Sequence, residues 1–240
     1  MNQHTESGEF TIAIILAGSI LFYYLYYYTA HSQFLKNKLN IRNKVTSEIR
    51  IFLLKKIIGL LFLGVIPGII YYGFLRPEYK LLEFFQGSVS SILITTLVLT
   101  FIIGIFVFVN QKANVNRNSL QMDIDEWTVN LFFINITGWT LYLLGYEFLF
   151  RGILLFECEN SFGFWPAIAI NMVIYSAIHM VNGKAEALGA VVFGTVACYF
   201  ALTQRNILIP VFMHVALSIS SDYFSIKLNK NLKFVNSVSS

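Results

Sequence analysis

Residues 87–110 read GSVSSILITTLVLTFIIGIFVFVN, and none of these 24 residues carries a charge. The hydrocarbon core of a bilayer is about 30 Å thick, and about 20 apolar residues of α-helix cross it. Uncharged runs of about 17 residues or more are typical of membrane-spanning helices. We therefore expect this stretch to be a transmembrane helix.

The composition of the whole chain extends this interpretation. Of the 240 residues, 56% are hydrophobic and 12% are charged, whereas about a quarter of a soluble domain is charged. Such a chain cannot cover a water-facing surface, so the predicted fold class is all-α, a polytopic transmembrane helix bundle. Seven spans are predicted, with six or eight as alternatives. They are residues 10–30, 57–75, 87–110, 128–146, 160–183, 187–203 and 206–221. The fourth could instead be a spanning helix followed by an interfacial one, because apolar character continues to Phe156.

Basic residues gather in the connection between the first two predicted spans. Against one acid, Glu48, this connection holds seven basic residues: Lys36, Lys38, Arg42, Lys44, Arg50, Lys55 and Lys56. The positive-inside rule then places it in the cytoplasm, with the N-terminus outside and, for seven spans, the C-terminus in the cytoplasm. The net charge of +4 thus has a topological cause, and we predict no nucleic-acid partner. The predicted location is the lipid bilayer of a bacterial cytoplasmic membrane.

Charged and histidine residues within the predicted spans divide the chain into two parts. They are nearly absent before the polar connection at residues 111–127 and cluster after it. We expect one integral membrane domain over residues 1–240, with residues 1–110 as accessory helices and residues 126–226 as the functional core.

The stretch YLLGYEFLFRG, residues 142–152, places Glu147 and Arg151 in strongly apolar surroundings. Residues four apart lie on one face of a helix, so the two side chains can form an ion pair. In hydrocarbon such pairing is nearly obligatory for ionised groups. The pair could serve a reaction, or it could neutralise itself and orient the helix.

Two later spans carry polar groups at four-residue intervals. The fifth holds Asn171, Tyr175 and His179, with Asn182 three residues beyond, and the last holds His214, Ser218 and Asp222. Each polar group in lipid needs a partner, so a stripe of them indicates more than packing. We interpret Asp222 as an ordinary acid at the helix end.

Other features have a structural interpretation. Gly189 and Gly194 are small enough to allow close helix approach, and Cys158 and Cys198 lack the spacing of a disulfide framework or thiolate metal site. Two histidines and a carboxylate could bind zinc, but neither histidine belongs to an HExxH motif and Glu147 has Arg151 as a competing partner. We predict no cofactor and leave zinc open. Activation of a water molecule without a metal needs fewer groups than a zinc site does. It needs a general base and hydrogen-bond donors to the developing oxyanion.

Taken together, these motifs resemble the CPBP family, the CAAX-prenyl-protease and bacteriocin-processing (Abi) group of intramembrane endopeptidases. The resemblance covers roughly residues 128–221. It rests on Glu147-x-x-x-Arg151-Gly152, on an aromatic residue four positions before His179, and on Pro210-x-x-x-His214-x-x-x-Ser218, in the family's order and spacing.

The resemblance implies catalytic roles for Glu147, His179, His214 and Ser218. His179 matches the histidine that polarises the hydrolytic water, His214 the oxyanion histidine, and Ser218 the position often held by Asn. Glu147 and Arg151 match the second glutamate and the arginine of the family's Glu-Glu-x-x-x-Arg motif. Tyr146, Tyr175, Asn171 and Asn182 are expected to support the site.

Tyr146 departs from the family, which has the first motif glutamate at this position. A phenol, with an ordinary pKa near 10, is no general base at neutral pH. The first hypothesis is therefore an intramembrane endopeptidase in which water activated by Glu147 or His179 cleaves a membrane-associated or exported peptide. The alternative is an inactive relative that acts as a scaffold, chaperone or immunity factor for a membrane or secreted partner. A small-solute carrier is disfavoured, because repeat-related broken helices are absent from the sequence pattern.

Overall fold

The computed structural model describes residues 2–39, 43–113 and 120–236, and nearly all of the regular structure in them is helical. The N-terminal helices are α1 (Asn2–Ala30), α2 (Gln33–Leu39), α3 (Lys44–Leu60), α4 (Ile66–Ile70) and α5 (Val89–Ala113). The others are α6 (Val129–Glu147), α7 (Leu155–Phe162), α8 (Phe164–His179), α9 (Lys184–Gln204) and α10 (Leu208–Leu228). Two short strands, β1 (Glu126–Trp127) and β2 (Lys233–Phe234), pair in parallel. The predicted all-α bundle is confirmed.

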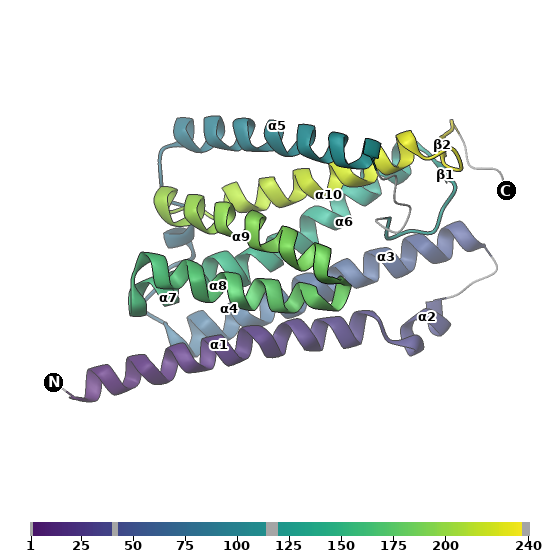
Figure 1. Cartoon of the computed structure of the whole chain (residues 1–240). Helices are drawn as coiled ribbons and strands as arrows, with labels where there is room; N and C mark the ends of the chain where they lie inside the picture. The colour runs from purple at the N-terminus through teal and green to yellow at the C-terminus, as the bar shows by residue number, and fades with distance from the viewer. Residues whose placement is uncertain (1, 40–42, 114–119, 237–240) are drawn as a thin grey trace.

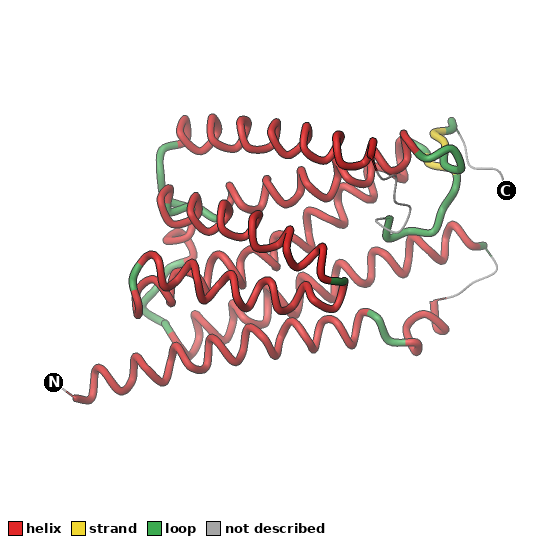
Figure 2. The backbone as a smooth tube through the Cα atoms, in the orientation of Figure 1, coloured by secondary structure: helices red, strands yellow, loops and turns green. Residues whose placement is uncertain are grey.

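Two of the helical rods contain π-helical turns. Segments η1 (Leu61–Val65) and η2 (Tyr71–Leu75) flank α4, so residues 44–75 form one rod, and η5 (Phe148–Leu154) joins α6 to α7 in a rod of residues 129–162 (Figure 2). A π turn widens a helix by one residue without ending it. With α1, α5, α8, α9 and α10, the described residues therefore contain seven long rods, one for each predicted span.

Four of these helical segments are long and apolar enough to cross a membrane, judged by length and composition. They are residues Phe10–Leu35, Val89–Lys112, Glu186–Gln204 and Leu208–Leu228. Helix α8 is apolar but shorter, and the other two rods contain the π turns. Several spans are therefore supported, and the number seven stays a prediction.

Helices α6 and α10 lie in the middle of the bundle, between α5 and α3 (Figure 1). Helix α10 packs against α5, α6 and α9, α8 packs against α7 and α9, and α3 packs against α6 (Figure 1). Helix α5 lies at the edge, with most of its apolar side chains exposed. This exposure fits a helix whose outer face meets lipid, as the sequence of residues 87–110 predicts.

Glycines let the rods of residues 44–75 and 129–162 cross closely. A Cβ on Gly64 would lie 2.9 Å from the Cα atom of Gly145, and a Cβ on Gly138 would lie within 3 Å of the Phe52 ring. Small residues permit this backbone approach. Gly145 lies two residues before Glu147, so the crossing fixes the α6 turn that bears the glutamate.

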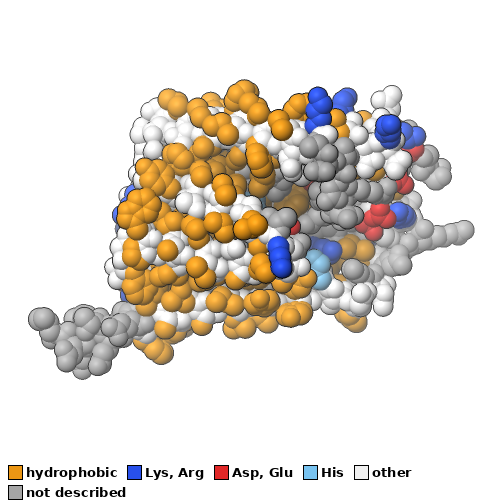
Figure 3. Space-filling view, viewed as in Figure 1, with side chains coloured by type: hydrophobic (Ala, Val, Ile, Leu, Met, Phe, Trp, Pro, Cys, Tyr) orange, Lys and Arg blue, Asp and Glu red, His pale blue; other side chains and the backbone are white. Residues whose placement is uncertain are grey.

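Charged side chains concentrate at one end of the bundle. Figure 3 shows a largely hydrophobic face whose acidic and basic residues gather mainly toward the end where β1 and β2 lie. The N-terminus of α3 and the turn between α8 and α9 point toward the same end (Figure 1). A charged end beside an apolar belt agrees with the surface pattern expected of a membrane protein.

Candidate active site

A π-helical segment begins directly after Glu147. In η5 the regular hydrogen-bond ladder shifts, and such π turns are frequent at functional sites. The Phe150 carbonyl within this segment accepts a hydrogen bond of 2.6 Å from Asn171 Nδ2, and the Cys198 thiol donates to Asn171 Oδ1 at 3.2 Å. Asn171 thus links η5, α8 and α9, which makes it a structural support for the Glu147 turn.

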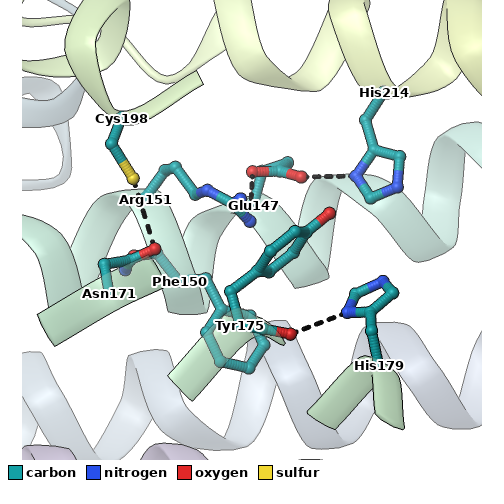
Figure 4. A network of polar contacts seen from close by, with 8 residues as sticks. All are labelled: Glu147, Phe150, Arg151, Asn171, Tyr175, His179, Cys198 and His214. Carbon is teal, nitrogen blue, oxygen red and sulfur yellow. Dashed lines mark hydrogen bonds and ion pairs between the residues drawn. The ribbon is translucent and has the colours of Figure 1, made fainter. Parts of the chain in front are cut away.

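Glu147 is fully buried and contacts two partners. Its Oε1 lies 2.5 Å from His214 Nδ1, and its Oε2 lies 3.2 Å from Arg151 Nη1 (Figure 4). The Arg151 contact does not satisfy hydrogen-bond geometry, so we treat it as an ion pair held by charge. Short contacts of a carboxylate with an N–H group are among the strong hydrogen bonds of proteins. Glu147 therefore joins α6 to α10.

Arg151 lies in a buried space that α9 leaves for it. Its guanidinium carbon lies 4.0 Å from the centre of the Tyr175 ring, a cation–π arrangement. A Cβ on Gly194 would approach Tyr175 Cδ1 to 3.1 Å and Arg151 Nη2 to 3.5 Å. The predicted packing role of Gly194 is confirmed. That of Gly189 is wrong, because a Cβ there would meet open space.

His179 is anchored through one ring nitrogen. Its Nδ1 lies 2.8 Å from the Tyr175 carbonyl oxygen one turn earlier on α8. A carbonyl can only accept, so the hydrogen bond assigns the proton to Nδ1 and leaves Nε2 with a lone pair in the neutral ring. The Nε2 atom has no hydrogen-bond partner among the described residues. It is thus placed to accept a hydrogen bond from water or substrate.

His214 repeats this arrangement with a carboxylate in place of the carbonyl. Its Nδ1 faces Glu147, and its ring packs against Phe193 at 5.0 Å between centroids. The neighbouring carboxylate selects the tautomer with the proton on Nδ1, and it stabilises the ring when protonated. Both histidines therefore have an anchored Nδ1 and an Nε2 unbonded in the described part of the chain.

Tyr146 lies between the two histidines. Its ring is edge-to-face with both, at 5.6 Å from His214 and 6.5 Å from His179, and it also packs against Phe150. The side chain is 2% exposed and its hydroxyl has no hydrogen-bond partner in the described structure. The residue that departs from the family motif thus fills space beside both imidazoles.

The structure brings most of the predicted site residues together. Glu147, Arg151, Asn171, Tyr175, His179 and His214 lie close together, and His214 joins the group through its contact with Glu147 (Figure 4). Ser218 lies one turn beyond His214 on α10, half-buried, and its hydroxyl makes no hydrogen bond in the described part of the chain. The Asn182 side chain lies outside the described residues.

The interpretation of Asp222 as an ordinary helix-end acid is wrong. Asp222 is 2% exposed, and its Oδ2 accepts hydrogen bonds from Asn135 Nδ2 and Trp139 Nε1, each at 2.8 Å. Its four-residue spacing from Ser218 contained the signal. The partners on α6 could not be identified from α10 alone.

Two further buried groups were missed. Glu157 is fully buried and accepts hydrogen bonds from Tyr71 at 2.6 Å and from Arg76 at 3.1 and 3.0 Å. Tyr23 of α1 packs edge-to-face on Tyr146, and its hydroxyl lies 3.4 Å from the Ile178 carbonyl. Helix α1 therefore forms one wall of the candidate site.

The candidate site offers few donors to a metal ion. No group of three His, Cys, Asp or Glu side chains there is arranged to hold a metal ion. The Glu147–His214 contact supplies at most two donors, and Arg151 lies on the remaining carboxylate oxygen. The described residues thus gather no three donors around Glu147, and the expectation of no cofactor, with zinc left open, stays a prediction.

Comparison with known proteins identifies one related family. Residues 126–220 match the family model described as type II CAAX prenyl endopeptidase Rce1-like. This segment begins at β1 and ends within α10, so it includes every helix that contributes to the Glu147 network. No curated protein and no solved structure matches the chain. The family resemblance of the motifs is confirmed.

Proposed function

We propose, from the membership of residues 126–220 in the Rce1-like family of type II CAAX prenyl endopeptidases, that this chain is an intramembrane endopeptidase. Its substrate would be a membrane-associated or exported peptide, cleaved by water. The observation that supports this best is the hydrogen bond between the fully buried Glu147 and the partly exposed His214, with His179 close by (Figure 4).

The chemistry follows from the free Nε2 atoms of the two histidines. Water is held by hydrogen bonds to both, and its oxygen attacks the scissile carbonyl carbon while one proton passes to His214 Nε2. Glu147, bonded to Nδ1 of the same ring, stabilises the imidazolium that forms, as a carboxylate does in a catalytic triad. Collapse of the tetrahedral intermediate breaks the C–N bond, and the leaving amine takes the proton from His214.

Charge balance assigns roles to the remaining residues. Arg151 offsets the charge of Glu147, and Tyr175 holds the guanidinium against its ring face. Ser218, one turn from His214, is the candidate donor to the oxyanion, because a hydroxyl can donate over a short reach. These assignments use no metal ion and no cofactor.

The site is proposed to face the cytoplasm. His179 ends α8, and the turn that follows lies toward the end of the bundle that bears α2 and the start of α3 (Figure 1). That end contains the basic connection, which the positive-inside rule assigns to the cytoplasm. The proposed setting is the cytoplasmic membrane of a bacterium, with the N-terminus outside.

An inactive relative that binds a membrane or secreted partner is the second candidate function, and one observation favours it. Tyr146 stands at the position of the family's first glutamate and packs against both imidazoles. If water cannot enter beside this ring, the fold retains the network without the reaction.

Peptide mass spectrometry distinguishes the two functions without knowledge of the substrate. Purified protein in liposomes is incubated with peptides extracted from a bacterial membrane fraction, and new peptide ends are identified. Wild type is expected to create ends that Glu147→Gln and His179→Gln do not. His31→Gln is the matched control, because His31 Nδ1 also contacts a carbonyl one turn earlier, at 2.9 Å, on α1. Identical peptide ends for wild type and Glu147→Gln would support the inactive relative.

A further inference from the structure

A second buried polar cluster lies between α3, α6 and α10, apart from the Glu147 network. Lys56 of α3 is 1% exposed and Asp222 of α10 is 2% exposed, and Asn135 of α6 is buried beside Asp222. Buried ionic groups are costly unless they are paired and hydrogen-bonded. Because the burial of these charges is costly, the contacts that offset this cost indicate the role of the cluster in the fold.

Trp139 connects the two charges of this cluster. The Lys56 ammonium lies over the Trp139 ring, 3.1 Å from its centroid, and the indole N–H donates to Asp222 at 2.8 Å. An aromatic ring is negative on its face and positive at its edge. The indole thus receives a cation on its face and a carboxylate on its edge, which matches its charge distribution on both sides.

Aromatic rings complete the surroundings of Lys56. The ammonium also lies 4.7 Å from the Tyr142 ring centroid and 5.2 Å from that of Phe52. It has no hydrogen-bond partner in the described structure, so the ring faces are its direct contacts, and the Asp222 carboxylate, bonded to the edge of the Trp139 ring, acts on it through space. Gly138 makes this possible, since a Cβ there would come within 3.3 Å of Lys56 Cγ.

The spacing of this cluster matches that of the proposed active site. On α6, Trp139 precedes Glu147 by eight residues, and on α10 Asp222 follows His214 by eight residues. The two helices run in opposite directions (Figure 1). The Trp139–Asp222 contact therefore lies about 12 Å along the same α6–α10 interface from the Glu147–His214 contact. A slip of either helix by one turn would break both contacts together.

We propose that Asp222, supported by Lys56 and Trp139, is a positioning residue that sets the register between α6 and α10 and thereby places His214 on Glu147. Neither Lys56 nor Asp222 lies in the segment that matches the family model. The expected effect on catalysis rests on the proposed peptidase function. The role of Asp222 in setting the register between α6 and α10 does not depend on that function.

A spectroscopic signal of His214 tests the register without any activity. In protein labelled with isotopes at histidine, the proton of the short Nδ1–H bond to Glu147 gives a downfield resonance, assigned by its loss in His214→Gln. Asp222→Leu removes both hydrogen bonds and is expected to abolish or shift this resonance. Asp222→Asn keeps an acceptor oxygen for Asn135 and Trp139 and is expected to retain it.

Charge compensation tests the role of Lys56. Lys56→Met leaves Asp222 without its cation and is expected to lower the amount of folded protein, and the double variant Lys56→Met/Asp222→Asn is expected to restore it. The exposed ion pair of Lys44 and Asp123, at 2.9 Å, is the matched control. Lys44→Met and Asp123→Asn are expected to leave both the resonance and the protein level unchanged.

For peptidase activity the expectation is a kcat effect. Displacement of a catalytic group by about 1 Å can cost about 100-fold in rate, so Asp222→Leu should lose about that factor in kcat with KM nearly unchanged. Asp222→Asn should lose less than about threefold. If Asp222→Leu does not fold, Trp139→Phe replaces it, because it keeps a ring face for Lys56 and loses the bond to Asp222. An unchanged His214 resonance in a folded Asp222→Leu or Trp139→Phe protein would overturn the proposal, whether or not wild type is a peptidase.

Discussion

Arg151→Met is the substitution whose effect follows most directly from the structure. Methionine keeps the length and the apolar stem of the side chain but removes the cation beside a fully buried carboxylate. Breaking a buried ion pair by removal of one partner costs about 3–5 kcal/mol, because the other charge is left uncompensated. His214 still contacts Glu147 Oε1, so we expect a value near 3 kcal/mol.

The assay is equilibrium unfolding of purified protein in mixed micelles, followed by helical circular dichroism. Arg205→Met is the matched control, because Arg205 makes two contacts with Glu159, at 2.5 and 3.0 Å, but its side chain is 46% exposed. Exposed pairs contribute about 0–1 kcal/mol. The difference between the two variants therefore isolates the effect of burial.

A double-mutant cycle with Glu147→Gln completes the test. The glutamine is neutral, so Arg151→Met should lower the free energy of unfolding much less in the Glu147→Gln background. The expected coupling free energy is about 1–3 kcal/mol. Additive effects, or an Arg151→Met cost no larger than that of Arg205→Met, would refute the argument that these two buried groups neutralise each other.

Four further predictions concern the reaction and its support. Tyr146→Phe should keep most peptidase activity while Glu147→Gln loses about 100-fold or more; equal losses in the two variants would contradict the assignment of Glu147. Tyr146→Glu adds a carboxylate beside His179 and His214 and should change the rate in a folded protein, and an unaltered rate would show that position 146 does not reach the water. Prolonged treatment with a zinc chelator should leave activity intact, and inhibition reversed by added zinc would contradict the metal-free site. Asn171→Leu strands the Phe150 carbonyl and should cost about 1–3 kcal/mol of stability, measured by the same unfolding assay. The control is Ser176→Ala, which removes a part-buried hydrogen bond of 3.2 Å from α8 to the Ala187 carbonyl.

The fold class could be predicted because lipid imposes a simple rule on the sequence. Every backbone polar group in the bilayer must be satisfied within the helix, so uncharged runs such as residues 187–203 mark helices directly. The π segment after Glu147 could not be predicted in this way. Its Phe150 carbonyl accepts a hydrogen bond from Asn171, which lies on another helix, and such a contact between helices is not visible in the local sequence.

Site residues were predictable where their spacing lies on one helix. Glu147 and Arg151 form the expected i,i+4 pair, whereas the contact of Glu147 with His214 joins residues 67 positions apart. The burial of Asp222 could not be predicted for the same reason, because its hydrogen-bond partners lie on α6. Whether an acid is buried depends on how the helices pack against one another. A hydropathy profile along the sequence does not report that packing.

The most direct test of the central claim is hydrolysis in water enriched in heavy oxygen. Wild-type protein and Glu147→Gln, each in liposomes, are incubated with the membrane peptide fraction, and the new carboxyl ends are weighed by mass spectrometry. The proposed reaction predicts that wild type creates ends that contain one heavy oxygen atom and that Glu147→Gln creates almost none. Ends formed equally by both proteins, or wild-type ends without the heavy atom, would contradict a peptidase that activates water through Glu147 and His214.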